Sequence, residues 1–214
     1  MEFAAGIGQA FAEKIKGEND YVKESGLEVD EATLRLNLWL TQALVLAAAA
    51  ASSFWVHGWQ GTLGLFSFPG WKGIGLACGV AAGIVLFSIA METYLPRRWQ
   101  DDGSINEKVF GAMSSSLTVL VCVIVGIGEE WLFRGVIQPF AGNAWTSLIF
   151  TLVHVRYLKK PLLIASVYGT SWLLGLLMDW HGSLWPPIVA HIAIDVSLAF
   201  YLQKTLKKEK GEEE

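Results

Sequence analysis

The chain consists of long apolar runs separated by short polar connections. Runs of this length can cross a bilayer as helices, which need about 20 apolar residues each. A backbone in lipid must satisfy its own hydrogen bonds, and an α-helix does so within one segment. The pattern therefore predicts an all-α, polytopic membrane helix bundle with about six transmembrane helices. The predicted spans are residues 34–56, 73–95, 109–140, 144–157, 162–178 and 184–202.

Two of the segments outside the predicted spans have a distinctive pattern. Residues 58–70 are rich in glycine and end in Pro-Gly, which predicts a loop. Residues 1–33 are polar, but apolar side chains recur there every four positions, at Phe3, Ile7, Phe11 and Ile15. This spacing is typical of a short amphipathic helix lying on the membrane surface. A terminal tail with accidental spacing would show the same pattern.

Lysine and arginine gather in every second connection. They lie in the N-terminal arm, in residues 96–108, in residues 156–160 and in the charged tail at 204–214. Cytoplasmic loops of membrane proteins carry an excess of these residues, so both termini are predicted to be cytoplasmic. We divide the chain into an N-terminal arm (1–33), one transmembrane domain (34–203) and a tail (204–214).

The composition agrees with an integral membrane protein. The sequence is 53% hydrophobic and 17% charged, whereas soluble domains average about 25% charged residues. A net charge of −4 without a basic stripe gives no indication of nucleic-acid binding. The two cysteines, Cys78 and Cys122, lie in apolar runs and are expected to be small buried hydrophobic residues. The bilayer is therefore an expected partner.

Charged residues interrupt the third apolar run. The segment GIGEEWLFRG at 126–135 carries Glu129, Glu130 and Arg134. Ionisable groups in hydrocarbon cost ~2.5–3.5 kcal/mol each on insertion scales and are usually functional. In a helix, Glu130 and Arg134 are four residues apart and can pair on one face. Glu129 points about 100° away around the helix and is left free for chemistry.

Three further ionisable residues lie inside other spans. They are His154, one helical turn after Phe150, and His191, one turn before Asp195. A single buried histidine is most often a hydrogen-bonded core residue. Here, however, separate spans each bring a group that is costly to bury without a partner. We therefore predict that they share one polar pocket with Glu129.

Such a pocket suits the activation of water. A carboxylate kept away from bulk water becomes a stronger base. One histidine beside it can hold the same water or return a proton to a leaving amine, and a second can donate to an oxyanion. A Glu-His-His set is also compatible with zinc. Because the helical motif His-Glu-x-x-His is absent, we expect no metal and no cofactor, with zinc as the alternative.

These residues form three motifs along the chain, and the motifs, in this order, resemble those of the CPBP family of intramembrane glutamic endopeptidases. That family includes the CAAX prenyl proteases and the Abi-type bacteriocin-processing or immunity proteins. Its motifs are EExxxR, FxxxH and HxxxN, or a similar polar last residue. Here they are Glu129-Glu130 with Arg134, Phe150 with His154, and His191 with Asp195. The match covers about residues 115–200 and includes FRG at 133–135 and GSLWPP at 182–187.

The resemblance implies a role for each motif residue. Glu129 and His154 would activate the attacking water, and His191 with residue 195 would stabilise the oxyanion. Glu130, Arg134 and Phe150 would be structural support. It further implies a peptide or protein substrate, which could be lipid-modified or membrane-anchored, and a prokaryotic plasma membrane.

Asp195 departs from the asparagine form of the last motif. An ionised aspartate cannot donate a hydrogen bond to an oxyanion, whereas the amide of asparagine can. We therefore predict that Asp195 lies behind His191 and orients it.

Three functions are compatible with these observations. The first is an intramembrane endopeptidase that cleaves near the C-terminus or the membrane-proximal part of a peptide. The second is a catalytically silent peptide-binding or bacteriocin-immunity protein, and the third is a proton-coupled carrier. The intact set of Glu129, His154 and His191 favours the first over the second. The lack of an inverted repeat disfavours the third.

Overall fold

The computed structural model describes residues 31–96, 105–154 and 160–211. The predicted amphipathic stripe of residues 3–15 lies outside these ranges, as do several basic residues of the predicted cytoplasmic loops. Residues 1–38 and 39–214 form two separate compact units. The packing and the candidate site described below belong to the second unit.

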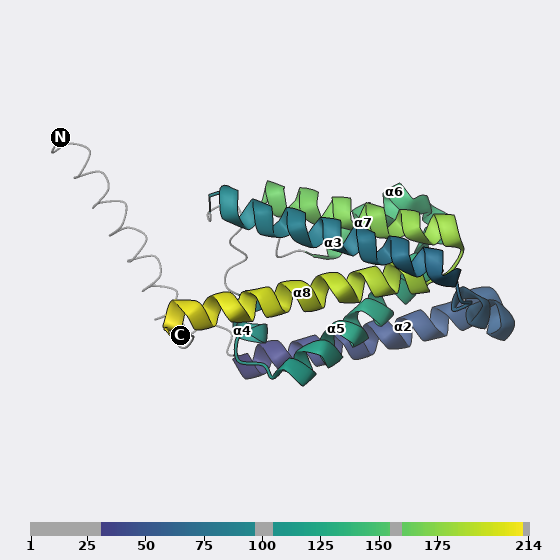
Figure 1. Ribbon diagram of the computed structural model, residues 1–214. Helices are drawn as coiled ribbons and strands as arrows, with labels where there is room; N and C mark the ends of the chain where they lie inside the picture. Colours follow the sequence, from purple (N-terminus) through teal and green to yellow (C-terminus); the bar gives the residue numbers. More distant parts are fainter. Residues whose placement is uncertain (1–30, 97–104, 155–159, 212–214) are drawn as a thin grey trace. The chain divides into compact units, whose positions relative to one another are not determined.

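The described residues are helical, without a strand, so the all-α class is confirmed (Figure 1). Five helical stretches among them are long and apolar enough to cross a membrane, which agrees with an integral membrane protein. The helices are α2 (Glu31–Leu65), α3 (Gly70–Tyr94), α4 (Ile105–Phe110), α5 (Ser115–Glu130), the π-helix η2 (Trp131–Ile137), α6 (Gln138–Val153), α7 (Pro161–His181) and α8 (Trp185–Lys210).

The third and fourth predicted spans run together. Helices α5, η2 and α6 form one helical stretch of 39 residues, Ser115–Val153. A kink at Gly142, with φ 75° and ψ 162°, interrupts this stretch where the sequence predicts a break. A positive φ of this size is accessible to glycine because it has no Cβ. The expected division is therefore present as a kink within a continuous helical stretch.

Two predicted boundaries are wrong. The loop predicted at 58–70 is largely helical, because α2 continues to Leu65 past a kink at Gly58 with φ 65°. The third span begins at Ser115, since Val109 belongs to the short helix α4. The hydroxyl of Ser114 accepts from the Leu117 N–H at 3.4 Å and marks this start as an N-cap. At the other end of the chain, α8 continues to Lys210, into the predicted tail.

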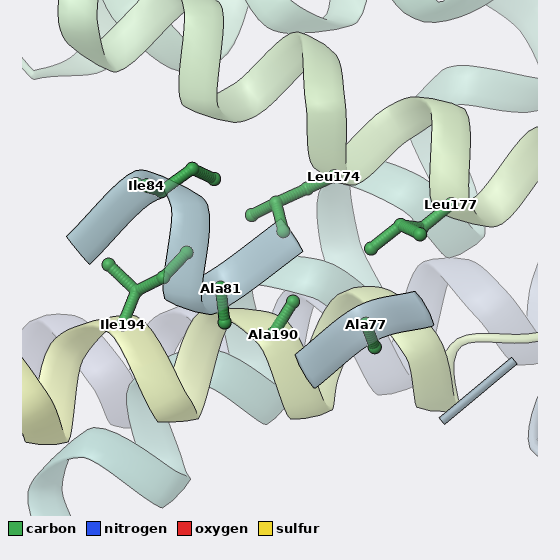
Figure 2. Close-up of a cluster of buried hydrophobic side chains, with 7 residues drawn as sticks. All are labelled: Ala77, Ala81, Ile84, Leu174, Leu177, Ala190 and Ile194. Carbon is green, nitrogen blue, oxygen red and sulfur yellow. The ribbon is translucent and has the colours of Figure 1, made fainter. Parts of the chain in front are cut away.

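Helix α8 lies at the centre of the packing in this unit. It packs against α3, α5 and α7, and in Figure 1 it runs between α3 and α5. Its contact with α3 and α7 is apolar, and alanines of α3 and α8 lie in it beside isoleucines and leucines, as Figure 2 shows. The buried cluster consists of Ala77, Ala81, Ile84, Leu174, Leu177, Ala190 and Ile194. This apolar contact holds α8 against α3 and α7. The separate contact between α8 and α5 brings His191 beside the end of α5.

Candidate active site

Two glycines bring neighbouring helices close to the C-terminal end of α5. A Cβ at Gly126 would lie 2.7 Å from Cγ1 of Ile192 on α8, so only glycine fits without a shift of the neighbour. A Cβ at Gly128 would lie 3.3 Å from Cδ2 of Leu46 on α2. The next two residues, Glu129 and Glu130, therefore lie between α2 and α8.

Glu130 is fully buried and has two charged or polar partners. Its Oε2 accepts from Nε of Arg134 at 3.1 Å, which confirms the predicted pair. Its Oε1 lies 2.8 Å from Nδ1 of His191 on α8. An ionised carboxylate can only accept, so Nδ1 of His191 carries the proton. Glu130 therefore also holds His191, a contact that the spacing within one helix does not predict.

Arg134, which is also fully buried, connects this pair to α7 and α6. Its Nη2 donates to the backbone oxygen of Ser171 at 2.9 Å and to the Ser171 hydroxyl at 2.7 Å. Its Nη1 lies 3.5 Å from Oε1 of Gln138. Gln138 in turn donates to the Gly175 carbonyl at 2.9 Å and to Oδ1 of Asp179 at 2.7 Å. A buried charge is tolerated only when it is paired and hydrogen-bonded in this way.

A π-helix directly follows the two glutamates. In the π-helix Trp131–Ile137, hydrogen bonds join residues five positions apart, as when the N–H of Gln138 donates to the carbonyl oxygen of Phe133. Nε2 of His57 on α2 lies 2.8 Å from the carbonyl oxygen of Gly135 within this helix. Single π turns are rare and are frequently found at functional sites. The sequence pattern does not predict this one.

Glu129 lies on the other side of α5 and has a different environment. It is partly exposed, and Oε1 accepts from Nε2 of Gln42 on α2 at 3.4 Å. His154, His191 and Asp195 are its ionisable neighbours on other helices. The structure therefore brings together the four residues for which the resemblance implies a role in the reaction, and it adds Gln42.

Phe150 packs between the two histidines. Its ring centroid lies 4.5 Å from that of His154 and 6.4 Å from that of His191. Nδ1 of His154 donates to the Phe150 carbonyl oxygen at 2.7 Å, which fixes the imidazole at the C-terminal end of α6. Phe150 also contacts Phe133 edge to face at 4.9 Å and lies 5.8 Å from the guanidinium of Arg134. It joins the buried pair to the partly exposed site.

Asp195 contacts His191 through the second ring nitrogen. Its Oδ2 lies 3.4 Å from Nε2 of His191, and its side chain is 34% exposed. His191 therefore lies between two carboxylates, with the buried Glu130 at Nδ1 and the partly exposed Asp195 at Nε2. The contact between Asp195 and His191 agrees with their spacing of four residues. The prediction that Asp195 lies behind His191 is wrong, because the group on the buried side of the ring is Glu130 and Asp195 lies on the partly exposed side.

Sequence reasoning missed Gln42. The one signal was an amide within the otherwise apolar run of the first span. In the ranges that the structure describes, no three His, Cys, Asp or Glu side chains are arranged so that they could hold a metal ion.

Comparisons with known proteins identify the family. Residues 111–197 match the model described as type II CAAX prenyl endopeptidase Rce1-like. The chain is also 35% identical over 176 residues to the uncharacterized protein YpbD of Bacillus subtilis (strain 168), covering 81% of this chain and 93% of YpbD. The chain belongs to the Rce1-like CAAX endopeptidase family. No solved structure matches it. The family segment contains Glu129, Glu130, His154, His191 and Asp195, whereas Gln42 lies outside it.

Proposed function

We propose that this chain is an intramembrane endopeptidase of the glutamic type. It would hydrolyse a peptide bond near the C-terminus or the membrane-proximal part of a peptide or protein substrate. The nucleophile would be a water molecule activated by Glu129 and His154. Membership of a family described as endopeptidases supports this proposal, as does the chemistry of the side chains around Glu129.

The observation that carries the proposal is the different use of two adjacent glutamates. Both oxygens of Glu130 have partners in a fully buried network with Arg134 and His191. Glu129 is partly exposed and lies within electrostatic range of both histidines. A general base must reach the water from which it removes a proton, and it must be able to exchange that proton. Glu129 meets both requirements, whereas Glu130 does not.

The proposed reaction proceeds in two steps. The Glu129 carboxylate takes a proton from water as the water oxygen attacks the scissile carbonyl carbon, which forms a tetrahedral oxyanion. His191, held at Nδ1 by Glu130, would donate from Nε2 to the oxyanion and exchange for it the contact that Nε2 makes with Oδ2 of Asp195 at 3.4 Å. The carbon–nitrogen bond then breaks, and the proton on Glu129 passes to the leaving amine. His154 holds the water and takes part in the proton transfer.

We propose that Asp195 acts on His191 and does not itself bind the oxyanion. An aspartate beside Nε2 cannot donate to the oxyanion if it is ionised, but it favours a protonated His191. Glu130 acts in the same direction from the other nitrogen. A protonated imidazole is the stronger donor to a developing negative charge.

The test uses purified full-length chain in detergent micelles and in proteoliposomes. Peptides with a membrane-anchoring apolar segment, with and without a prenyl group on a C-terminal cysteine, are incubated and analysed by mass spectrometry. Glu129→Gln should lower kcat by about a thousandfold or more, in the range known for the loss of a catalytic group. Glu107→Gln, the same change at an exposed position on α4, is the matched control and should leave kcat unchanged.

The outcome also distinguishes the second candidate function. A catalytically silent peptide-binding protein would bind the same peptides without producing fragments, and Glu129→Gln would then change nothing. Full turnover by the Glu129→Gln variant would refute the glutamic mechanism. In the host, comparing C-termini between cells with the wild type and with Glu129→Gln would identify natural substrates as unprocessed proteins.

A further inference from the structure

The contact between Gln42 and Glu129 involves a residue that no motif includes. Gln42 lies on α2 and is 5% exposed. It is one turn before Leu46, which packs against Gly128, and this places the amide beside Glu129. The distance from Nε2 of Gln42 to Oε1 of Glu129 is 3.4 Å, at the long end for a hydrogen bond. Catalytic hydrogen bonds are often long in the absence of substrate and shorten when it binds.

Gln42 is not explained as a structural hydrogen-bonding residue. In the described part of the chain its Oε1 is buried and has no hydrogen-bond partner. A buried polar atom left without a partner reduces stability. Within the described residues, the side chain of Gln42 makes one hydrogen bond, and that bond is to the proposed base.

Gln203 shows what a structural amide looks like in this protein. It lies on α8, and its Nε2 donates to the carbonyl oxygens of Phe110 at 2.8 Å and Met113 at 3.0 Å. It also lies 3.1 Å from the hydroxyl of Thr118. These contacts fix the connection between α4 and α5 to α8. The same type of side chain thus contacts two backbone carbonyls and a hydroxyl at position 203 and a single carboxylate at position 42.

We propose that Gln42 is a positioning residue for Glu129, and that α2 therefore contributes to the active site from outside the family segment. The inference rests on the proposed endopeptidase function. The amide N–H donates to one oxygen of the Glu129 carboxylate, fixes its orientation and favours its ionised form, which is the form that accepts a proton from water. No group from outside the protein is needed for this role.

The experiment compares Gln42→Leu with Gln203→Leu in the cleavage assay and in thermal unfolding of the full chain in detergent. Gln42→Leu should lower kcat about tenfold, as expected for one hydrogen bond to a charged group, with KM within about twofold of the wild type. Its unfolding temperature should stay the same or rise, because an unsatisfied buried amide is replaced by an apolar side chain. Gln203→Leu should lower the unfolding temperature and leave kcat of the folded fraction unchanged.

Gln42→Glu provides a second, independent variant. It keeps the length of the side chain, replaces the donor by an acceptor and adds a charge beside Glu129, so kcat should fall about a hundredfold. An unchanged kcat in both Gln42→Leu and Gln42→Glu would overturn the inference. So would a kcat loss in Gln42→Leu that is matched by an equal loss of folded protein. If Glu129→Gln retains full activity in the same assay, the proposed function itself fails, and the two failures are thereby distinguished.

Discussion

The two sides of α5 at its C-terminal end differ in almost every property, although the residues on them are adjacent and identical. On one side, Glu130 is fully buried, with Arg134 on Oε2 and His191 on Oε1. On the other, Glu129 is partly exposed and is contacted by the amide of Gln42. The first environment fixes a charge permanently, whereas the second leaves a carboxylate that can accept and release a proton. A rotation of about 100° around one helix thus separates a structural role from a proposed chemical one.

The largest effect expected from this difference between the two glutamates is on stability. Glu130→Gln leaves Arg134 as a buried charge with a weaker partner, and it should lower the free energy of unfolding by about 3–5 kcal/mol. Glu129→Gln should change the same quantity by less than about 0.5 kcal/mol, because its side chain is partly exposed. Chemical or thermal unfolding of both variants in the same detergent gives the two values. Equal losses in the two variants would show that the glutamates do not differ in role.

A smaller effect on stability is expected when the hydrogen bonds of Arg134 on the buried side are changed. Arg134→Lys keeps the charge but loses the planar array that reaches Glu130 and Ser171 together, so the free energy of unfolding should fall by about 2 kcal/mol. Ser171→Ala removes one of these acceptors, the hydroxyl, and should cost about 1 kcal/mol. An Arg134→Lys variant as stable as the wild type would mean that the charge alone matters.

The next prediction concerns Asp195, which lies at the edge between the two sides. Asp195→Asn keeps an oxygen that can face Nε2 of His191, so its kcat should stay within about threefold of the wild type. Asp195→Ala leaves that side of the imidazole without a partner and should lower kcat about tenfold. Steady-state kinetics on both variants provides the comparison. A greater loss in Asp195→Asn than in Asp195→Ala would assign a direct proton-transfer role to the aspartate.

No effect is expected from chelators. The Glu129 and His154 pair is sufficient for water activation, and the described residues hold no group of three suitable ligands. Cleavage rates measured with EDTA and with 1,10-phenanthroline should therefore equal the untreated rate. Loss of activity with recovery on addition of one metal would place Glu129 and the histidines in a coordination sphere.

Contacts within one helix could be predicted from the sequence; between helices, the sequence predicted that Glu129 and the two histidines share one pocket but not which atoms pair. The pair of Glu130 with Arg134 and the approach of Asp195 to His191 follow from a spacing of four residues, which fixes neighbours on a helix surface. The bond between Glu130 and His191 depends on how α5 and α8 are rotated and shifted against each other. The close approach at Gly126 and Ile192 sets that geometry, and a hydrophobic pattern does not encode it.

Three further features were not predicted, each for a different physical reason. The π-helix at Trp131–Ile137 differs from an α-helix by one residue in a single turn, and the apolar pattern tolerates such a change. Gln42 was missed because a neutral amide in an apolar run carries a much weaker signal than a charge. The helical end of α2 was missed because glycines normally predict a loop, whereas here Gly58 forms a kink and the helix resumes.

The order in which the chain is made gives the pairing of Glu130 with Arg134 a consequence for membrane insertion. Ser171 and His191, the partners on later helices, follow 37 residues after Arg134 and 61 residues after Glu130, respectively. While the segment around 130 enters the bilayer, these partners have not yet been inserted. Glu130 and Arg134, four residues apart, can neutralise each other from the start. The pair can therefore enter the membrane without a net charge of its own, and the later helices add hydrogen bonds to a pair that already exists.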